Sequence, residues 1–267
     1  MRIQTLSALG AFGLIVAING FAQAGEKNWG SYQVGDIRSG YTYATKETRA
    51  MQDDDLMNPA MIWVDQGEDL WSTADGDAGK ACQDCHQNAE DSMKGVSAKY
   101  PVVHAKSGKL MDVTQRINEC RTDRMKAKSW KSESNQMLGM TAFIGMQSRG
   151  MPSTVKVDGA AKPFFEQGKA FFYQRRGLLD MACSNCHEDN AGNMIRANLL
   201  TQAQSNGFPT YRLKWQKVGS LHRRFKGCNK NIRAQPYKSG SDEYKSLELF
   251  MSWRGRGLPG ETPAVRN

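Results

Sequence analysis

The pentapeptides "CQDCH" at residues 82–86 and "CSNCH" at residues 183–187 decide how this 267-residue chain is interpreted. Each has the C-x-x-C-H pattern of a c-type haem, whose porphyrin is bonded by the two thiols and whose iron is bound by the histidine. A zinc site or a redox dithiol would explain each cysteine pair, but neither requires a histidine after both pairs. The sequence therefore predicts two covalently bound haem c groups. Their expected attachment residues and iron ligands are Cys82, Cys85 and His86 in the first motif, and Cys183, Cys186 and His187 in the second.

The residues around the two motifs form an internal repeat. "GEDLWSTADGDAGKACQDCH", from Gly67, aligns without a gap to "GKAFFYQRRGLLDMACSNCH", from Gly168. Further on, "RINEC" (116–120) matches "RFKGC" (224–228), and "MTAFIGMQSRGMP" (140–152) matches "LELFMSWRGRGLP" (247–259). Each half thus contains a glycine-led helix, a haem motif, a later cysteine, and a helix that ends in Arg-Gly-apolar-Pro. This pattern indicates a duplicated haem module.

The hydrophobic pattern favours an all-α fold. Apolar residues recur at helical intervals over residues 133–147, 164–176 and 241–253, while strand-like alternation is scarce. We expect two tandem domains that resemble class I cytochromes c, preceded by an N-terminal extension that packs on the first domain. The expected boundaries are 25–60 for the extension, 61–151 for domain 1 with the first haem, 152–163 for a linker, and 164–267 for domain 2 with the second haem and the active site.

The N-terminus has the features of an export signal. A basic residue precedes an apolar run, and "AQA" follows it, which predicts a signal peptide over residues 1–24 with cleavage after Ala24. No other segment is long and apolar enough to cross a bilayer. The formal net charge of +9 could suit nucleic acid, but an exported protein rarely meets it. The charge therefore favours an acidic protein partner or an anionic substrate.

Each haem iron needs a ligand opposite its motif histidine, and the repeat helps to choose it. Methionine and histidine are the common ligands, but the available ones change to other residue types in the opposite half. Only Cys120 and Cys228 recur at equivalent positions, and we favour them as the second axial ligands. A disulfide between these two cysteines, or two inert buried thiols, remains an alternative. The methionines and histidines considered are Met140, Met146, Met151, Met251, His104 and His222.

The residues that flank the two cysteines differ in charge. Cys228 lies within "HRRFKGCN" (222–229), where Arg223, Arg224 and Lys226 precede it and Gly227 removes side-chain bulk beside the sulfur. Cys120 has acidic and basic neighbours in similar number. The second site is therefore expected to attract a small anion. Arg256 is a weaker candidate for substrate binding, and a structural role or a contact with a haem propionate is the alternative.

These motifs resemble the SoxA family, the cytochrome subunits of SoxAX complexes. The resemblance rests on two C-x-x-C-H modules, each with a later cysteine, and on the Arg-x-x-x-Cys element "RFKGC". It implies a periplasmic protein that pairs with SoxX, a small monohaem cytochrome, and attaches thiosulfate oxidatively to a cysteine of the carrier protein SoxYZ. Electrons would pass to a soluble cytochrome c.

The resemblance also implies roles for individual residues. The haem of the active site would be ligated by His187 and by Cys228, which would carry an extra sulfur as a persulfide and act as the covalent sulfur relay. Arg224 would bind thiosulfate near that sulfur, with Arg223 and Lys226 assisting, and the first haem would be ligated by His86 and Cys120. Two alternatives remain open: a dihaem thiosulfate dehydrogenase that forms tetrathionate, and a dihaem electron-transfer cytochrome without a substrate of its own.

Overall fold

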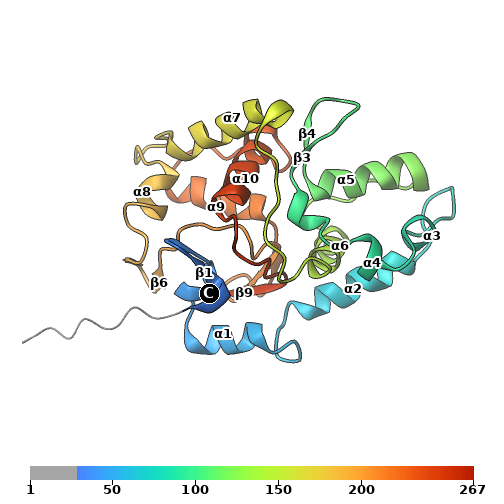
Figure 1. The fold of residues 1–267 in the computed structure, drawn as a ribbon, viewed down its shortest axis with the longest axis horizontal. Helices are drawn as coiled ribbons and strands as arrows, with labels where there is room; N and C mark the ends of the chain where they lie inside the picture. Colours follow the sequence, from blue (N-terminus) through green and yellow to red (C-terminus); the bar gives the residue numbers. More distant parts are fainter. Residues whose placement is uncertain (1–28) are drawn as a thin grey trace, which may run out of the picture.

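A computed structural model describes residues 29–267, so the expected signal peptide lies outside the described residues. Helices make up most of the regular structure (Figure 1). The α-helices are α1 (Lys46–Asp53), α2 (Met61–Ser72), α3 (Gln83–His86), α4 (Ala89–Ser92), α5 (Val113–Cys120), α6 (Asn135–Met146), α7 (Lys162–Tyr173), α8 (Cys183–His187), α9 (Leu221–Asn231) and α10 (Asp242–Arg254). Shorter helical turns are η1 (Gly30–Tyr32), η2 (Gly40–Tyr43), η3 (Ser97–Lys99), the π-helical η4 (Arg121–Met125) and η5 (Gly159–Ala161).

The three helices expected from the hydrophobic pattern are confirmed as α6, α7 and α10. Ser134 is the N-cap of α6 and Ser241 is the N-cap of α10. In each case the serine hydroxyl accepts a hydrogen bond from the backbone N–H of the third helical residue. In α7 a proline occupies the first turn, where its missing N–H leaves no hydrogen bond unmade. Local sequence therefore sets where these helices begin.

Two pairs of crossed helices form the centre of the two halves, α2 with α6 and α7 with α10. A glycine lies at each crossing. A Cβ added to Gly67 would lie 2.3 Å from the carbonyl oxygen of Gly139, and one added to Gly168 would lie 1.9 Å from that of Ser246. The expectation that these glycines lead their helices is wrong, because both lie in the middle, where the neighbouring backbone approaches too closely for any side chain.

Equivalent aromatic contacts occur beside the two crossings. The ring of Trp71 lies 5.8 Å from that of Phe143 in the first half. In the second half, the ring of Phe172 lies 5.5 Å from that of Phe250. These residues occupy matching positions of the sequence repeat, so the two halves share backbone crossings and core contacts.

The expectation of an all-α chain is too simple, since short strands are also present. Three two-stranded antiparallel sheets pair β1 with β2, β3 with β4 and β5 with β6. A three-stranded sheet has the order β8-β7-β9, in which β7 pairs antiparallel with β8 and parallel with β9. The strands are β1 (Gln33–Val34), β2 (Ile37–Arg38), β3 (Val102–Val103), β4 (Leu110–Met111), β5 (Met194–Ile195), β6 (Asn198–Leu199), β7 (Thr210–Arg212), β8 (Lys217–Gly219) and β9 (Ala264–Arg266).

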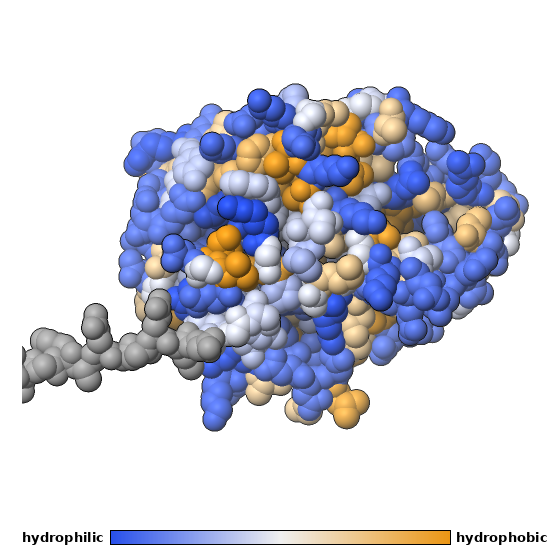
Figure 2. Space-filling model, in the orientation of Figure 1, coloured by the Kyte–Doolittle hydropathy of each residue, from blue (hydrophilic) through white to orange (hydrophobic). Residues whose placement is uncertain are grey.

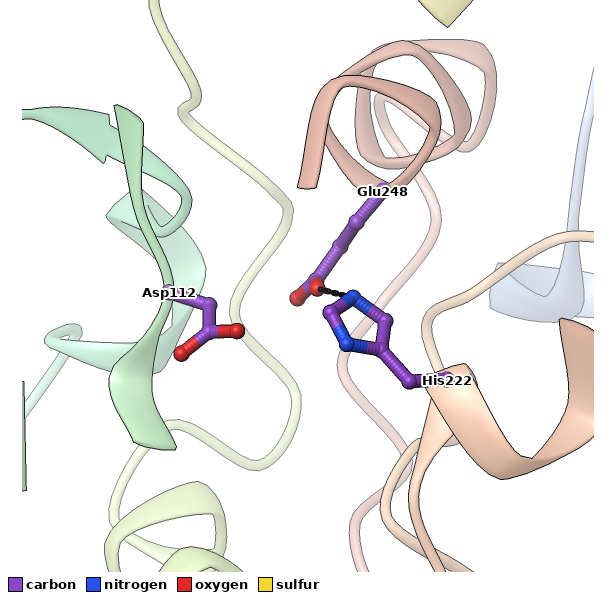
Figure 3. A group of neighbouring side chains, drawn as sticks. All are labelled: Asp112, His222 and Glu248. Carbon is purple, nitrogen blue, oxygen red and sulfur yellow. Dashed lines mark ion pairs between the residues drawn. The ribbon is translucent and has the colours of Figure 1, made fainter. Parts of the chain in front are cut away.

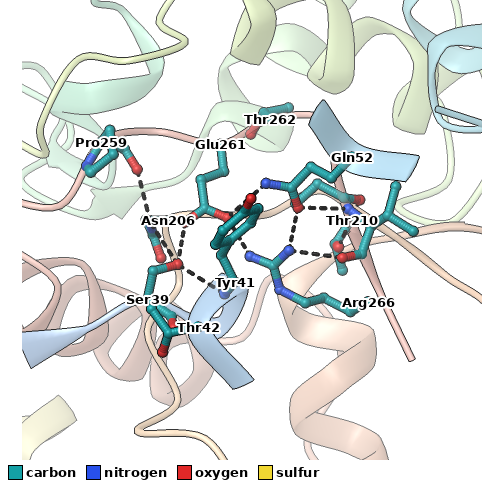
Figure 4. A network of polar contacts seen from close by, with 12 residues as sticks. Ser39, Tyr41, Thr42, Gln52, Asn206, Thr210, Pro259, Glu261, Thr262 and Arg266 are labelled. Carbon is teal, nitrogen blue, oxygen red and sulfur yellow. Dashed lines mark hydrogen bonds and ion pairs between the residues drawn. The ribbon is translucent and has the colours of Figure 1, made fainter. Parts of the chain in front are cut away.

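The N-terminal segment, residues 29–60, packs largely on the C-terminal segment rather than on the first domain alone. Ser39 donates to the carboxylate of Glu261, and the side-chain oxygen of Gln52 accepts the backbone N–H of Val265 at 3.1 Å. Arg266 and Asn206 bind the same carboxylate, so Glu261 joins three parts of the chain (Figure 4). The N-terminal segment thus holds the C-terminal residues, including Val265 of β9, through hydrogen bonds.

The two halves also share buried apolar contacts. One cluster of the core combines Ala60 and Leu138 with Tyr211, Val218 and Val265 from the second half. The face in Figure 2 is mostly hydrophilic, with apolar side chains in separate patches. In the part of the chain that the structure describes, no helix combines the length and apolar composition needed to cross a membrane.

Candidate haem and sulfur site

The second haem motif forms the single helical turn α8, which places its histidine for iron binding. Nδ1 of His187 donates to the carbonyl oxygen of Thr201 at 2.6 Å, because a carbonyl oxygen can only accept. The other ring nitrogen is then unprotonated in the neutral side chain and available to a metal. A hydrogen bond of this kind orients most metal-binding histidines.

Cys228 lies opposite this histidine, on helix α9. Ser220 caps α9 by accepting the backbone N–H of Arg223 at 3.1 Å. The spacing of four residues places Arg224 and Cys228 on one face of the helix, and the Cys228 sulfur lies close to the side chain of His187. The structure therefore brings together the histidine, the cysteine and the arginine that the sequence singled out.

Positive charge around Cys228 favours its thiolate. Burial alone would raise the pKa of this thiol, but Arg224, the side chain of His187 and Arg212 together lower its pKa to about 7. Burial and then the charge of Cys228 raise the pKa values of Cys183 and Cys186, so the two thiols of the motif lie near the Cys228 sulfur. The donor set of two attachment thiols, an oriented imidazole and a third sulfur fits a c-type haem that would be held by His187 and Cys228.

Sequence reasoning missed Arg212, which lies on β7. Burial, followed by the charge of Arg224, lowers its pKa to about 10, and the Cys228 sulfur acts in the opposite direction. Its guanidinium donates from Nε to the backbone oxygen of Asn267 at 2.8 Å and lies over the Trp215 ring. Arg212 has no equivalent in the sequence repeat and lies outside the helix that contains Cys228. Its effect on the Cys228 sulfur is therefore visible only in the structure, where β7 pairs with β9.

The other basic candidates contact different groups. Arg223 stacks on the ring of Trp215, 4.4 Å from its centroid, and Nη1 lies 3.8 Å from the carboxylate of Glu133. Lys226 lies near His222. Burial and the charge of Lys226 would lower the pKa of His222, but Glu248 and Asp112 raise it. Arg256 is exposed and covers the ring of Trp253 at 4.1 Å. Arg224 and Arg212 are thus the arginines whose charges act on the Cys228 sulfur.

The first haem motif has a similar arrangement with different electrostatics. It forms α3, where the ring of His86 lies 5.8 Å from that of Trp71. Cys120, at the end of α5, lies close enough to affect the charge on Cys82. Burial raises the pKa of Cys120 even though Arg116 opposes it. The expected second ligand is therefore present, but its surroundings do not stabilise a thiolate as those of Cys228 do.

The alternative ligands have other contacts. Met140 and Met251 are buried among the core side chains of the two halves. His104 lies beside Glu119, with Nε2 3.4 Å from its carboxylate. All six cysteines lie within the described residues and are free thiols, so Cys120 and Cys228 are not bonded to each other.

His222 belongs to a separate cluster with Asp112 and Glu248, between the two halves (Figure 3). Its Nε2 lies 3.0 Å from Glu248, and its Nδ1 accepts the backbone N–H of Gly240 at 3.0 Å. Such a trio could suit a divalent metal. A metal bound to Nε2 of His222 would, however, leave the single proton of the neutral ring on Nδ1, where it would face the N–H of Gly240 and that hydrogen bond could not form. The hydrogen bond from Gly240 therefore favours a contact between the two halves over a metal site.

Comparisons with known proteins agree with this site. A family model described as the SoxA/TsdA cytochrome c domain matches residues 66–153. The L-cysteine S-thiosulfotransferase subunit SoxA of Paracoccus pantotrophus is 48% identical over 231 residues, which are 86% of this chain and 79% of that protein. The same subunit of Rhodovulum sulfidophilum is 44% identical over 232 residues, 87% of this chain and 81% of that protein.

A solved structure is similar along most of the chain. The crystal structure of SoxXA from P. pantotrophus matches with a TM-score of 0.84 at 48% identity, and the match covers 86% of this chain and 87% of the other. Together with the sequence relatives, this match covers both haem motifs and both later cysteines of the repeat. The chain therefore belongs to the SoxA family of cytochrome subunits.

Proposed function

We propose that this chain, with a SoxX-type monohaem cytochrome, oxidatively conjugates thiosulfate to a cysteine of a SoxYZ-type carrier protein in the periplasm. The observation that carries the proposal is the position of Cys228, which faces His187 and has its pKa lowered to about 7 by Arg224, His187 and Arg212. Relatives up to 48% identical bear the name of L-cysteine S-thiosulfotransferase subunit. A carrier of electrons alone has no need of a cationic pocket around a sulfur ligand.

We further propose that two haem c groups are held by duplicated modules, at residues 61–151 and 164–267. His187 and Cys228 would be the axial ligands of one haem, and His86 and Cys120 those of the other. When bound, the haem beside Cys228 would accept electrons one at a time and pass them to SoxX and a soluble cytochrome c. The matched helix crossings at Gly67 and Gly168 support the duplication.

Thiosulfate would bind through its negative charge. Arg224 and Arg212 present two guanidinium groups to the space beside the Cys228 sulfur, and charge-assisted hydrogen bonds to a partly buried anion are strong. Arg223 and Lys226 would contribute positive charge only at longer range, because Arg223 lies 3.8 Å from the carboxylate of Glu133 and Lys226 lies near His222. The pocket would thus hold the outer sulfur of thiosulfate next to Cys228.

The chemistry would consist of two balanced steps at sulfur. In the first, the Cys228 thiolate and the outer sulfur of thiosulfate form an S–S bond, and two electrons leave. In the second, the carrier's cysteine thiolate attacks that outer sulfur, takes the thiosulfate group and releases the Cys228 thiolate. A persulfide on Cys228 would perform the same steps through its outer sulfur. A pKa near neutrality suits a sulfur that must act first as nucleophile and then as leaving group.

The surface around the second motif supports a protein partner. Apolar side chains before and after α8 are exposed, which is typical of a docking surface when several lie together. We propose that the SoxX-type subunit covers this region. The exposed residues are Tyr173, Leu178, Leu179, Met194, Ile195 and Leu199.

The proposal can be tested with the haem-loaded complex of this chain and its monohaem partner. Thiosulfate, the carrier and an electron acceptor should yield a carrier peptide that has gained a thiosulfate group, as measured by mass spectrometry. The Cys228 peptide should carry one extra sulfur if it is a persulfide, and Cys228→Ser should abolish conjugation. Tetrathionate as the product would instead identify a thiosulfate dehydrogenase, and electron transfer without any thiosulfate consumption would identify a simple carrier.

A further inference from the structure

The two later cysteines share a preceding arginine but differ in the residue directly before them. Each follows an arginine by four residues on a helix, Arg116 before Cys120 and Arg224 before Cys228. The residue next to the cysteine is Glu119 in the first half, whereas a glycine takes its place in the second. At this spacing the preceding residue lies one helical turn from the arginine, within reach of its guanidinium.

In the first half, the glutamate neutralises the arginine. The carboxylate of Glu119 forms a short ion pair with Nη1 of Arg116, and its other oxygen lies 3.4 Å from Nε2 of His104. Arg124 also acts on the Cys120 sulfur, but its side chain is exposed, so its charge is hydrated and screened. An anion that approaches Cys120 therefore meets an arginine that already has a carboxylate partner.

In the second half, the glycine leaves the arginine available. No carboxylate among residues 29–267 forms an ion pair with Arg224, whose charge instead acts on the Cys228 sulfur and on Arg212. The fold does not require a glycine here. A Cβ added to Gly227 would meet nothing within 4 Å, and its φ lies outside the left-handed region. Glycine in a helix interior costs about 1 kcal/mol relative to alanine, so the fold alone gives no reason for it.

We propose that the pair Glu119 and Gly227 determines which of the two equivalent cysteines receives the anionic substrate. Gly227 keeps Arg224 unpaired for thiosulfate, while Glu119 occupies Arg116 and excludes the anion from Cys120. Both residues are specificity determinants that act through a neighbouring arginine rather than by touching the substrate. The inference rests on the proposed function, because it takes thiosulfate as the anion.

The test compares Gly227→Glu with Gly227→Gln in the haem-loaded complex. Glutamate and glutamine have nearly the same shape, so they separate charge from bulk. Gly227→Glu should pair with Arg224 as Glu119 pairs with Arg116, and should weaken thiosulfate binding about 10- to 100-fold, the range expected for a lost charge-assisted contact. Gly227→Gln should weaken it less than about 3-fold. Calorimetric titration with thiosulfate, without carrier or electron acceptor, measures binding apart from turnover.

The outcomes separate this inference from the proposed function. Equal effects of the two variants, or wild-type affinity in Gly227→Glu, would overturn the inference while leaving the function intact. Loss of haem is monitored in each variant by its absorbance, and Gly227→Gln serves as the control for folding. A wild-type complex that neither binds nor consumes thiosulfate would overturn both.

The reverse substitution tests the first half. Glu119→Gln should free Arg116, so calorimetry should detect a second and weaker thiosulfate-binding event that disappears in Glu119→Gln combined with Arg116→Ala. Absence of the second event in Glu119→Gln would show that the glutamate does not exclude the anion.

Discussion

Cys228 differs from Cys120 because of the charges placed around it. Arg224 belongs to the same helical face, His187 lies close to the sulfur, and the charge of Arg212 acts on it from β7, so these groups together overcome the effect of burial. Around Cys120, burial prevails and its pKa is raised. The sequence showed the contrast in net charge between the two sites, but not which basic side chains face the sulfur, because that depends on the direction in which each one leaves its helix.

Arg224→Ala should raise the thiosulfate KM and lower kcat/KM about 10- to 100-fold, since a hydrogen bond to a charged group contributes about 1.5–3 kcal/mol. The variant should retain its bound haem. Arg223→Ala is the matched control, because Arg223 contacts Trp215 and Glu133 and should change kcat/KM less than about 3-fold. Steady-state kinetics with a fixed carrier concentration would check this, and equal losses in the two variants would refute the docking role of Arg224.

At the scale of the elements, helices were predictable and strands were not. The helices α6, α7 and α10 contain apolar residues at helical spacing and begin at recognisable caps, so local sequence sufficed. The strands contain two or three residues each, too few to show the alternation that predicts a strand. Their pairing also depends on distant partners, as β7 and β9 show, which explains why an all-α chain was expected.

The mid-helix glycines provide a test of packing at this scale. Gly168→Ala should destabilise the fold by about 1–3 kcal/mol or more, because the added Cβ would lie 1.9 Å from the carbonyl oxygen of Ser246 and would push α7 away from α10. Gly227→Ala is the control, since it adds a methyl group in open space within a helix and should raise stability by up to about 1 kcal/mol. Chemical denaturation of the haem-loaded variants measures both; a neutral Gly168→Ala would contradict the close approach.

At the scale of the whole molecule, the two halves are joined more closely than tandem domains with a linker. Leu138 from the first half packs with Val218 and Val265 from the second, and the buried side chain of Lys245 donates to the carbonyl oxygen of Leu110 at 2.7 Å. The N-terminal segment adds contacts through Glu261. None of these contacts follows a short-range pattern, so the sequence indicated the contact of the extension with the first domain, as in the ion pair of Asp55 with Arg149, but not its contacts with the C-terminal segment.

The contact between the halves should make stability depend on pH. Burial and then the charge of Glu248 raise the pKa of Asp112 to about 6, although His222, the Gln115 backbone N–H and Lys245 oppose this. The folded protein therefore binds a proton that the unfolded chain, with a pKa of about 3.9, releases. This stabilising contribution is complete below about pH 4 and is lost as the pH rises through about 6.

Asp112→Asn should remove this dependence. Asparagine is as good an N-cap as aspartate, so it can still accept the backbone N–H of Gln115 at the start of α5. As the pH falls from about 7 to about 5, the unfolding free energy of the wild type should rise relative to the variant, by an amount that cannot exceed about 3 kcal/mol. Urea denaturation at both pH values measures the difference, and parallel changes in the two proteins would refute the assignment.

By itself, the sequence determined the two C-x-x-C-H motifs, the repeat, the principal helices and the two cysteines that recur with it. These features depend on residue spacing along the chain, and a helix or a C-x-x-C-H turn is set by neighbours within a few residues. The tertiary structure decided that Cys228 faces His187, that Arg212 joins Arg224 beside the sulfur, and that Glu119 pairs with Arg116. These depend on the packing of distant segments, because the charges that act on a partly buried sulfur come from whichever side chains the fold brings within a few ångströms of it.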